Sequence, residues 1–158
     1  MAQTNQKYEL LDHDTVQAWG GRTLKRIRAL VAIGSLVAAG ELGGYIESED
    51  NLACNGDAWV YGNARVSGDA RVYGDAWVYG NAWIEQRTDL FWISIIGSEN
   101  GTYTAFKNKD GGILVNRGCF SGTLEEFTDA VNKRHSGKFH EEYQLVIELT
   151  KLRLGKDA

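Results

Sequence analysis

The side chains best suited to act as a general base near neutral pH are three histidines, His13, His135 and His140. None lies between His13 and His135, so the long central part of the chain offers no histidine. A metal site at His135 and His140 would need a better spacing or a third ligand. We therefore expect no metal, no cofactor and no catalytic residue set.

A hexapeptide repeat occupies the centre of the chain. Residues 56–85 read GDAWVY, GNARVS, GDARVY, GDAWVY and GNAWIE in one uninterrupted register. Residues i and i+2 of a strand point to the same side, so two apolar columns are predicted to face inward together. The Gly-Asp and Gly-Asn pairs between them are turn residues that tolerate positive φ. The columns are Ala58, Ala64, Ala70, Ala76 and Ala82, and Val60, Val66, Val72, Val78 and Ile84.

A short strand followed by a corner, repeated, predicts a triangular coil, and the pattern resembles the hexapeptide repeats of left-handed parallel β-helices. We expect a mainly β protein with a short left-handed parallel β-helix of about three coils over residues 37–97. Residues 1–36 are expected to form an N-terminal β-hairpin cap. Residues 98–158 are expected to form a C-terminal β-hairpin and two α-helices.

The signals in the C-terminal part are local. Asp110-Gly111 predicts a hairpin turn. Thr123 and Glu126 form a capping box at the start of the first helix. The second helix is expected from about His140 to Arg153, buried on two sides because leucines broaden its apolar stripe.

Outward-facing residues of the repeat are the candidate site. If coils stack, residue n lies next to residue n+18, so aromatic side chains gather on one face. Four such rings at about 150–250 Å² each exceed the apolar patch that a soluble monomer usually exposes. The N-terminal hairpin or C-terminal helices could cover them, or a second copy, or a partner. The candidates for a partner-binding or oligomer interface are Trp59, Tyr61, Trp77, Tyr79, Arg65, Arg71 and Trp83.

Two charged clusters leave alternatives open. Lys25, Arg26 and Arg28 could form an anion-binding patch or the solvated face of a two-stranded cap. Clustered carboxylates could bind Ca²⁺ or form a solvated acidic edge. They are Glu41, Glu47, Glu49 and Asp50.

Composition favours a cytoplasmic protein. The formal charge of −4 argues against general nucleic-acid binding. The N-terminus lacks the apolar core of a signal peptide, and no apolar run approaches the roughly 20 residues of a membrane span. Cys54 falls in the inward valine column and is expected to be a small buried hydrophobe. Cys119 has no obvious histidine or asparagine partner in local sequence, which argues against a catalytic thiol. Two cysteines cannot make a disulfide framework, which favours a reduced protein.

Nearly the whole chain resembles the hexapeptide-repeat proteins encoded by phages and prophages of bacteria. The resemblance rests on KYEL, TLKRIRAL, VAAGELGGYIESEDNL, the repeats, TAFKNKDGG, GCFSGTLEEF and EYQLVIELTKLR. It implies a β-helix closed by a hairpin and two helices, in the cytoplasm of the bacterial host. It implies no reaction.

These features lead us to expect a non-enzymatic accessory protein that binds a host component as a homodimer or homotrimer. The resemblance suggests a counter-defence inhibitor, either an anti-CRISPR-like blocker of a host protein complex or a protein that sequesters a nucleotide signal. A self-assembling structural protein is one alternative. An acyltransferase of the hexapeptide-repeat type is another, although the coils supply no histidine.

Overall fold

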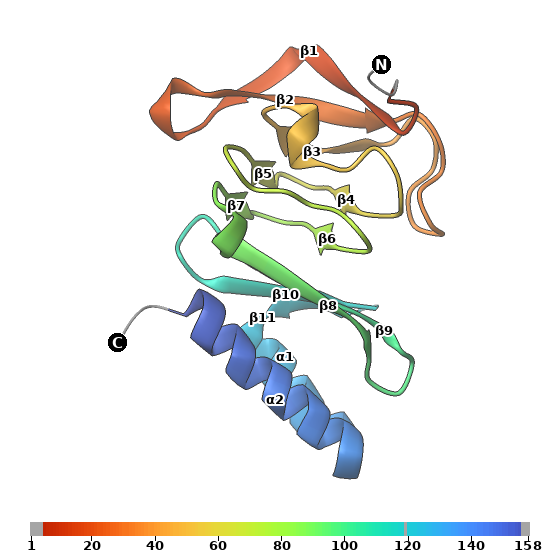
Figure 1. Cartoon of the computed structure of the whole chain (residues 1–158), viewed down its shortest axis with the longest axis vertical. Coiled ribbons are helices and arrows are strands. Elements are labelled where there is room, and N and C mark those ends of the chain that lie inside the picture. Colours follow the sequence, from red (N-terminus) through yellow and green to blue (C-terminus); the bar gives the residue numbers. More distant parts are fainter. Residues whose placement is uncertain (1–4, 119, 156–158) are drawn as a thin grey trace. The chain divides into compact units, whose positions relative to one another are not determined.

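The chain divides into two units, and the division falls after Arg87. The computed structural model describes residues 5–118 and 120–155. The N-terminal unit holds seven strands among the described residues (Figure 1). They are β1 (Tyr8–Gln17), β2 (Thr23–Ala29), β3 (Leu42–Ile46), β4 (Trp59–Val60), β5 (Arg65–Val66), β6 (Trp77–Val78) and β7 (Trp83–Ile84). Short 3-10 turns lie at Trp19–Gly21, Glu49–Asn51 and Arg87–Asp89.

A five-stranded mixed sheet joins the N-terminal hairpin to the repeat, in the order β1-β2-β3-β5-β7. The pairs β1–β2 and β2–β3 are antiparallel, whereas β3–β5 and β5–β7 are parallel. A separate two-stranded parallel sheet pairs β4 with β6. The hairpin therefore occupies the hydrogen-bonding edge that the repeat would otherwise present at β3.

The repeat pairs with itself at a spacing of 18 residues. Trp59 lies opposite Trp77 and Arg65 opposite Trp83. The alanine column is fully buried, and every member of the valine column has at most 1% of its surface exposed. Full burial of a valine side chain stabilises a fold by about 1.5–3 kcal/mol, so this column is the main apolar core of the unit.

One corner of the repeat shows why glycine is required there. Gly68 has φ +61°, a backbone conformation that side chains with a β-carbon rarely adopt. A β-carbon at Gly68 would also lie 2.6 Å from the carbonyl oxygen of Glu85 in the next coil. Close packing of successive repeats thus requires glycine at this position, both for its positive φ and for its missing β-carbon.

The fold class expected from the sequence, a left-handed parallel β-helix with terminal caps, is wrong for this chain. Its strands form three separate sheets: one mixed, one antiparallel and one of two parallel strands. Each parallel strand pair, β3–β5, β4–β6 and β5–β7, is only two residues long. Residues 90–96, expected in the last coil, instead form β8 (Leu90–Ile96), which pairs antiparallel with β9 (Gly101–Lys107).

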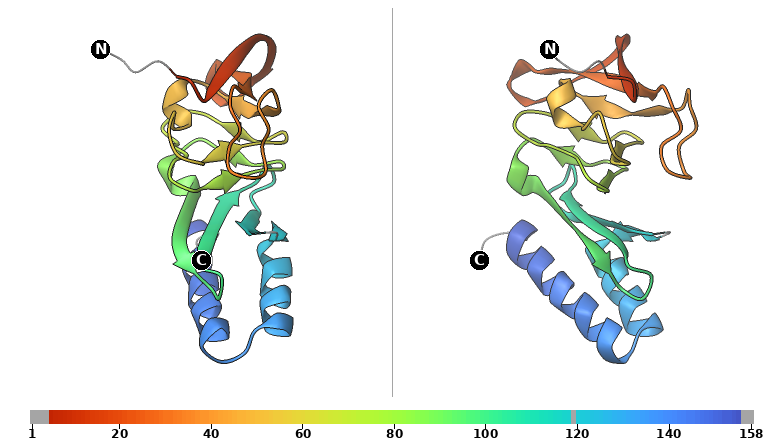
Figure 2. Two further views of the ribbon diagram at one scale, coloured as in Figure 1. Left: turned by 90° about the vertical axis from the view of Figure 1, so that its right-hand side faces the viewer. Right: turned by 45° about the vertical axis from the view of Figure 1, so that its right-hand side comes forward.

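The C-terminal unit places two helices against an antiparallel sheet of order β11-β10-β9-β8 (Figure 2). The strands β10 (Ile113–Arg117) and β11 (Phe120–Thr123) lead into α1 (Leu124–Arg134) and α2 (Gly137–Leu154). The core between sheet and helices contains aromatic side chains from both, among them Tyr103, Phe127 and Tyr143. Tyr103 donates or accepts a 2.7 Å hydrogen bond with Thr150, which ties β9 to α2.

The two helices differ in how closely they follow the expected pattern. The capping box of α1 is present: Thr123 Oγ1 accepts from Glu126 N at 3.1 Å, and Glu126 Oε1 accepts from Thr123 N at 2.9 Å. The second helix was expected to be buried on two sides, but its outer leucines are exposed: Leu145 at 72% and Leu152 at 81%. Among the described residues, no helix is both long and apolar enough to cross a membrane.

Candidate functional site

Trp59, predicted to face outward, lies in the core of the N-terminal unit with 0% of its surface exposed. Tyr8 of β1 covers it, with the two ring centroids 6.3 Å apart and the rings nearly perpendicular. The Tyr8 hydroxyl donates to the carbonyl oxygen of Leu52 at 2.6 Å, and burial raises the pKa of Tyr8. The N-terminal strand therefore folds over this ring, which is the internal covering that the sequence analysis left open as one alternative.

The other predicted aromatic residues are half-buried and pack against one another. Tyr61 stacks on Tyr79 with ring centroids 5.8 Å apart, and it meets the edge of Trp77 at 5.5 Å. The Arg65 guanidinium lies over the Trp83 ring at 5.1 Å. Because of these contacts, the aromatic side chains pack on their neighbours within the chain.

The two arginines of the predicted site lie in different settings. Arg65 Nη1 donates to the backbone oxygen of Gln17 at 2.9 Å, which links the repeat to the end of β1. Arg71 is exposed. The seven predicted residues therefore do not form one site.

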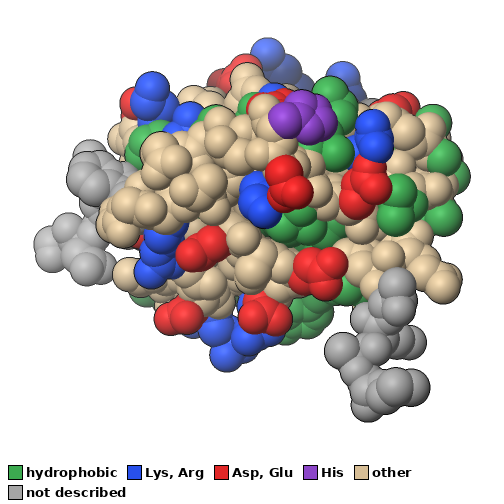
Figure 3. All heavy atoms as spheres, turned by 90° about the horizontal axis from the view of Figure 1, so that it is seen from above, with side chains coloured by type: hydrophobic (Ala, Val, Ile, Leu, Met, Phe, Trp, Pro, Cys, Tyr) green, Lys and Arg blue, Asp and Glu red, His purple; other side chains and the backbone are tan. Residues whose placement is uncertain are grey.

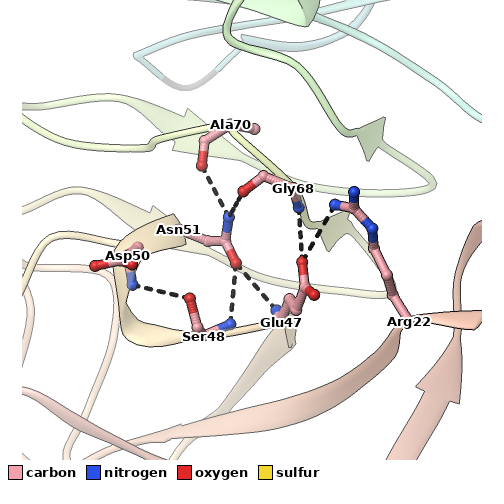
Figure 4. Close-up of polar contacts among 7 residues, drawn as sticks. All are labelled: Arg22, Glu47, Ser48, Asp50, Asn51, Gly68 and Ala70. Carbon is pink, nitrogen blue, oxygen red and sulfur yellow. Dashed lines mark hydrogen bonds and ion pairs between the residues drawn. The ribbon is translucent and has the colours of Figure 1, made fainter. Parts of the chain in front are cut away.

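Of the acidic residues near β3, Glu47 takes part through its carboxylate in a network of polar contacts around Asn51 (Figure 4). The Asn51 side chain accepts from the backbone of Glu47 and Ser48, and it donates to Gly68 O at 3.2 Å and Ala70 O at 2.9 Å. Glu47 accepts from Gly68 N at 2.8 Å and pairs with Arg22 at 3.4 Å. Among the residues that the structure describes, no group of three or more histidines, cysteines or carboxylates could hold a metal.

The basic residues of β2 are paired with carboxylates of β1. Lys25 pairs with Asp12 at 2.7 Å, Arg26 with Asp14 at 2.7 Å, and Arg28 with Glu9. Figure 3 shows acidic and basic side chains interspersed on one face of the molecule. This pairing removes the anion-binding patch considered from the sequence, because each positive charge has a neighbouring negative one.

The remaining candidates from the sequence are separated. His140 Nε2 lies 2.9 Å from Asn132 Oδ1, whereas the His135 ring packs 5.2 Å from the Tyr143 ring. Cys54 is exposed, contrary to the expected burial, because it sits in the irregular turn before the repeat. Cys119 lies outside the described residues.

A cavity in the C-terminal unit brings together residues that the sequence analysis did not connect. Its empty volume is about 390 Å³, which includes the open mouth. Two arginines, a histidine and three aromatic rings contribute to its wall, so it combines positive charge with apolar surface. The lining residues are Arg117, Phe120, Phe127, Ala130, Val131, Arg134, His135 and Tyr143.

Four elements position these side chains, and Phe120 is the first residue of β11. Arg117 is the last residue of β10, Phe127 and Arg134 lie on α1, and Tyr143 lies on α2. The rings of Phe120, Phe127 and Tyr143 pack edge-on, with successive centroids 5.2 and 5.5 Å apart. The aromatic wall is therefore held rigidly, because each ring is fixed by its neighbour.

Two polar atoms of residues that line this cavity are buried without a hydrogen-bond partner, namely Arg117 Nε and Tyr143 Oη, and the hydroxyl lies against Gly97, which does not line the cavity. They are the only such side-chain atoms among the residues described. Tyr143 has 1% of its surface exposed, and the Arg117 side chain has 13%. Burial raises the pKa of Tyr143 while the nearby Arg117 charge opposes the rise, so the hydroxyl remains a donor at neutral pH.

Electrostatics around the cavity favour an anion, with two opposing contributions, the C-terminal end of α1 and the Glu99 carboxylate, whose Oε2 lies 3.7 Å from Arg117 Nη1. Arg117 and Arg134 supply two permanent positive charges. The C-terminal end of α1, where His135 is the capping residue, disfavours an anion by about 0.3–1 kcal/mol. A charge-assisted hydrogen bond is worth about 1.5–3 kcal/mol, so the guanidinium groups outweigh the helix dipole.

Comparison with known proteins identifies no relative. No family model matches the chain, and no curated protein matches its sequence. The resemblance to phage-encoded hexapeptide-repeat proteins therefore stays a prediction.

The residues that line the cavity were not identified from the sequence, because they are far apart in the chain. Arg117 and Tyr143 are 26 positions apart, and Tyr143 belongs to the apolar stripe of α2, which by pattern alone indicates core. Arg134 and His135 carry the ordinary signal of a helix end.

Proposed function

We propose that this chain is a non-enzymatic binding protein that takes up a small anionic ligand in the cavity of its C-terminal unit. The observation that carries the proposal is a cavity whose wall combines two arginines, Arg117 and Arg134, with three aromatic rings. A guanidinium group binds an anion through charge-assisted hydrogen bonds, each worth about 1.5–3 kcal/mol.

Binding is favoured over catalysis because the described lining of the cavity offers donors and positive charge without a nucleophile or carboxylate base. His135 is the one histidine among the lining residues, and its ring packs against Tyr143. An acyltransferase would need a histidine at the coils, and the repeat has none. A self-assembling protein is disfavoured because β2 already pairs with the outer edge of β3.

The biological setting that we propose is the one implied by the family resemblance. The protein would act in the bacterial cytoplasm as a phage or prophage accessory factor, and it would sequester a small anionic signal of the host. A dimer or trimer is the expected assembly, which light scattering on the purified chain would measure.

The proposal is tested by isothermal titration calorimetry of the full chain with inorganic phosphate and adenosine monophosphate. Arg134 is exposed, so Arg134→Ala should weaken binding about tenfold without loss of folding. Lys133→Ala is the matched control, because Lys133 is the neighbouring exposed cation and does not line the cavity. Equal losses in both variants, or no saturable binding of either anion, would overturn the proposal.

A further inference from the structure

The exposed apolar side chains of the C-terminal unit lie on only two of its elements. Among the described residues of this unit, each large apolar side chain that is exposed belongs to β8 or to α2. Single apolar residues scattered over a surface are ordinary, whereas a contiguous group marks an interaction surface. These side chains form the β8–α2 patch: Ile93, Ile95, Leu145, Leu149 and Leu152.

Two hydrogen bonds align β8 with α2 and make the patch contiguous. Gly97, just beyond the end of β8, donates its backbone N–H to Glu142 Oε1 at 2.5 Å. Ile93 lies opposite Tyr103 in the sheet, and the Tyr103 hydroxyl shares a 2.7 Å hydrogen bond with Thr150. Residues 93–97 therefore run along α2 between its positions 150 and 142. The isoleucines of the patch consequently border its leucines.

The three leucines have the spacing of a short coiled-coil seam. Leu145, Leu149 and Leu152 are separated by four and three residues, so they occupy one face of α2 at successive d, a and d positions. Leu145 is 72% exposed and Leu152 is 81% exposed, so this face is uncovered within the chain. Toward the N-terminus the seam ends at Glu142, the preceding a position, and the isoleucines of β8 widen it instead.

Charges beside the seam select the orientation of a partner helix. Glu148 and Arg153 occupy g and e positions, five residues apart, on opposite flanks of the leucines. In a parallel pair of α2 helices, Glu148 of each copy faces Arg153 of the other. In an antiparallel pair, Glu148 faces the flank that carries Glu141 and Glu148 of the second copy, which is repulsive. Within its own helix Glu148 lies 3.9 Å from Lys151, an exposed ion pair that contributes little.

We propose that the β8–α2 patch binds a second copy of this chain, with the two α2 helices parallel about a two-fold axis. Such an interface uses the same patch on both copies, so the pair of Glu148 with Arg153 forms twice. Stable interfaces bury about 800 Å² per partner, and these five side chains supply the apolar core of a smaller one. The expected dimer is therefore weak, with a Kd of about 1–100 μM. No residue of the patch lines the cavity, so this inference is independent of anion binding.

Sedimentation velocity of the full chain, from about 5 to about 500 μM, measures the assembly. Leu152→Glu should raise the Kd of the dimer about ten- to hundredfold, because it places a charge in the apolar seam. Leu36→Glu is the matched control: Leu36 is 69% exposed but belongs to the N-terminal unit, so the Kd should change less than about twofold. Far-ultraviolet circular dichroism verifies that each variant is folded.

A charge exchange tests the parallel orientation. Glu148→Arg should weaken the dimer about three- to tenfold, because positive charges then face each other. The double variant Glu148→Arg/Arg153→Glu should return the Kd to within about twofold of the original. Additive losses in the double variant would overturn the inference, as would equal effects of Leu152→Glu and Leu36→Glu. A chain that stays monomeric at about 500 μM would also overturn it and would leave the patch to a different partner.

Discussion

Gly97 lies directly against the hydroxyl of Tyr143, so closely that a β-carbon at position 97 would overlap the Tyr143 Oη atom. Gly97 follows a bulge at Ile95, a β-branched residue held at φ +63°. Gly97 N then donates to Glu142 Oε1 at 2.5 Å, which joins the end of β8 to α2. Strained backbone of this kind is retained where the surrounding structure requires it, here beside Arg117 and Tyr143.

Gly97→Ala should destabilise the C-terminal unit by about 2–5 kcal/mol. The estimate combines the cost of a β-carbon at φ +78° with overpacking against Tyr143. Gly101→Ala is the matched control, because a β-carbon there meets no atom within 4 Å and its φ is not positive. Urea unfolding followed by near-ultraviolet circular dichroism measures both, and equal stabilities would contradict this account of Gly97.

Tyr143→Phe should leave folding stability within about 0.5 kcal/mol of the original chain or raise it slightly. The hydroxyl has no hydrogen-bond partner in the protein, so its removal relieves an unsatisfied buried group. A stability loss of about 1 kcal/mol or more would instead assign the hydroxyl a structural partner, and urea unfolding of the variant and the original chain measures the difference.

Thr123→Ala should lower the free energy of unfolding by about 0.5–2 kcal/mol, because it removes the side-chain bond that caps α1. Ser136→Ala provides an internal comparison. Ser136 is the N-cap residue of α2 but its side chain makes no capping hydrogen bond, so the change should cost little. Thermal unfolding of both variants by calorimetry makes the test, and a larger loss at Ser136 would refute it.

Asn51→Ala should destabilise the N-terminal unit by about 2–4 kcal/mol. The buried Asn51 side chain makes four hydrogen bonds, two within its own turn and two to the next coil. Asn63→Ala, at an exposed corner of the repeat, should stay within about 0.5 kcal/mol. Chemical unfolding followed by tryptophan fluorescence reports on this unit. Similar free energies of unfolding for the two variants would contradict this role of the Asn51 side chain.

Lowering the pH below the usual pKa of carboxyl groups should lower the free energy of unfolding. Hydrogen bonds from Arg26 and Tyr45 hold the pKa of Asp14 below its usual value of 3.8. A depressed pKa in the folded state contributes stability that is present above the unfolded pKa and is lost as pH falls through the folded pKa. Unfolding free energies measured from pH 5 to pH 2 should therefore fall, and Asp14→Asn should flatten the decline. An Asp14→Asn curve parallel to that of the original chain would exclude this contribution.

Several local features of the structure could be predicted from the sequence alone. The period of six predicted which alanines and valines are buried, because alternation along a strand and repetition of the corner fix the side that each residue faces. The same period predicted the 18-residue pairing of Trp59 with Trp77. The capping box at Thr123 and Glu126 was equally readable, since its two hydrogen bonds involve residues only three positions apart.

The fold class and the site were not predictable in this way. The periodicity was extended to Ile96, but residues 90–96 pair antiparallel with β9, since a strand of alternating residues accepts either kind of partner. Trp59 occupies an outward position of its strand and is nevertheless buried, because Tyr8, 51 positions earlier in the chain, packs over it. The alternation of residues along a strand predicts which side each side chain faces. It does not predict which other element of the protein packs over that side.

By itself the sequence determined the repeat register, its two buried columns and the start of α1, all of which depend on contacts at fixed, short spacings. Tertiary structure alone decided the burial of Trp59, the pairing of Lys25, Arg26 and Arg28 with carboxylates, and the cavity around Arg117 and Tyr143. The physical reason is that these features join residues from separate elements. Their side chains meet only when apolar surfaces far apart in the chain pack together.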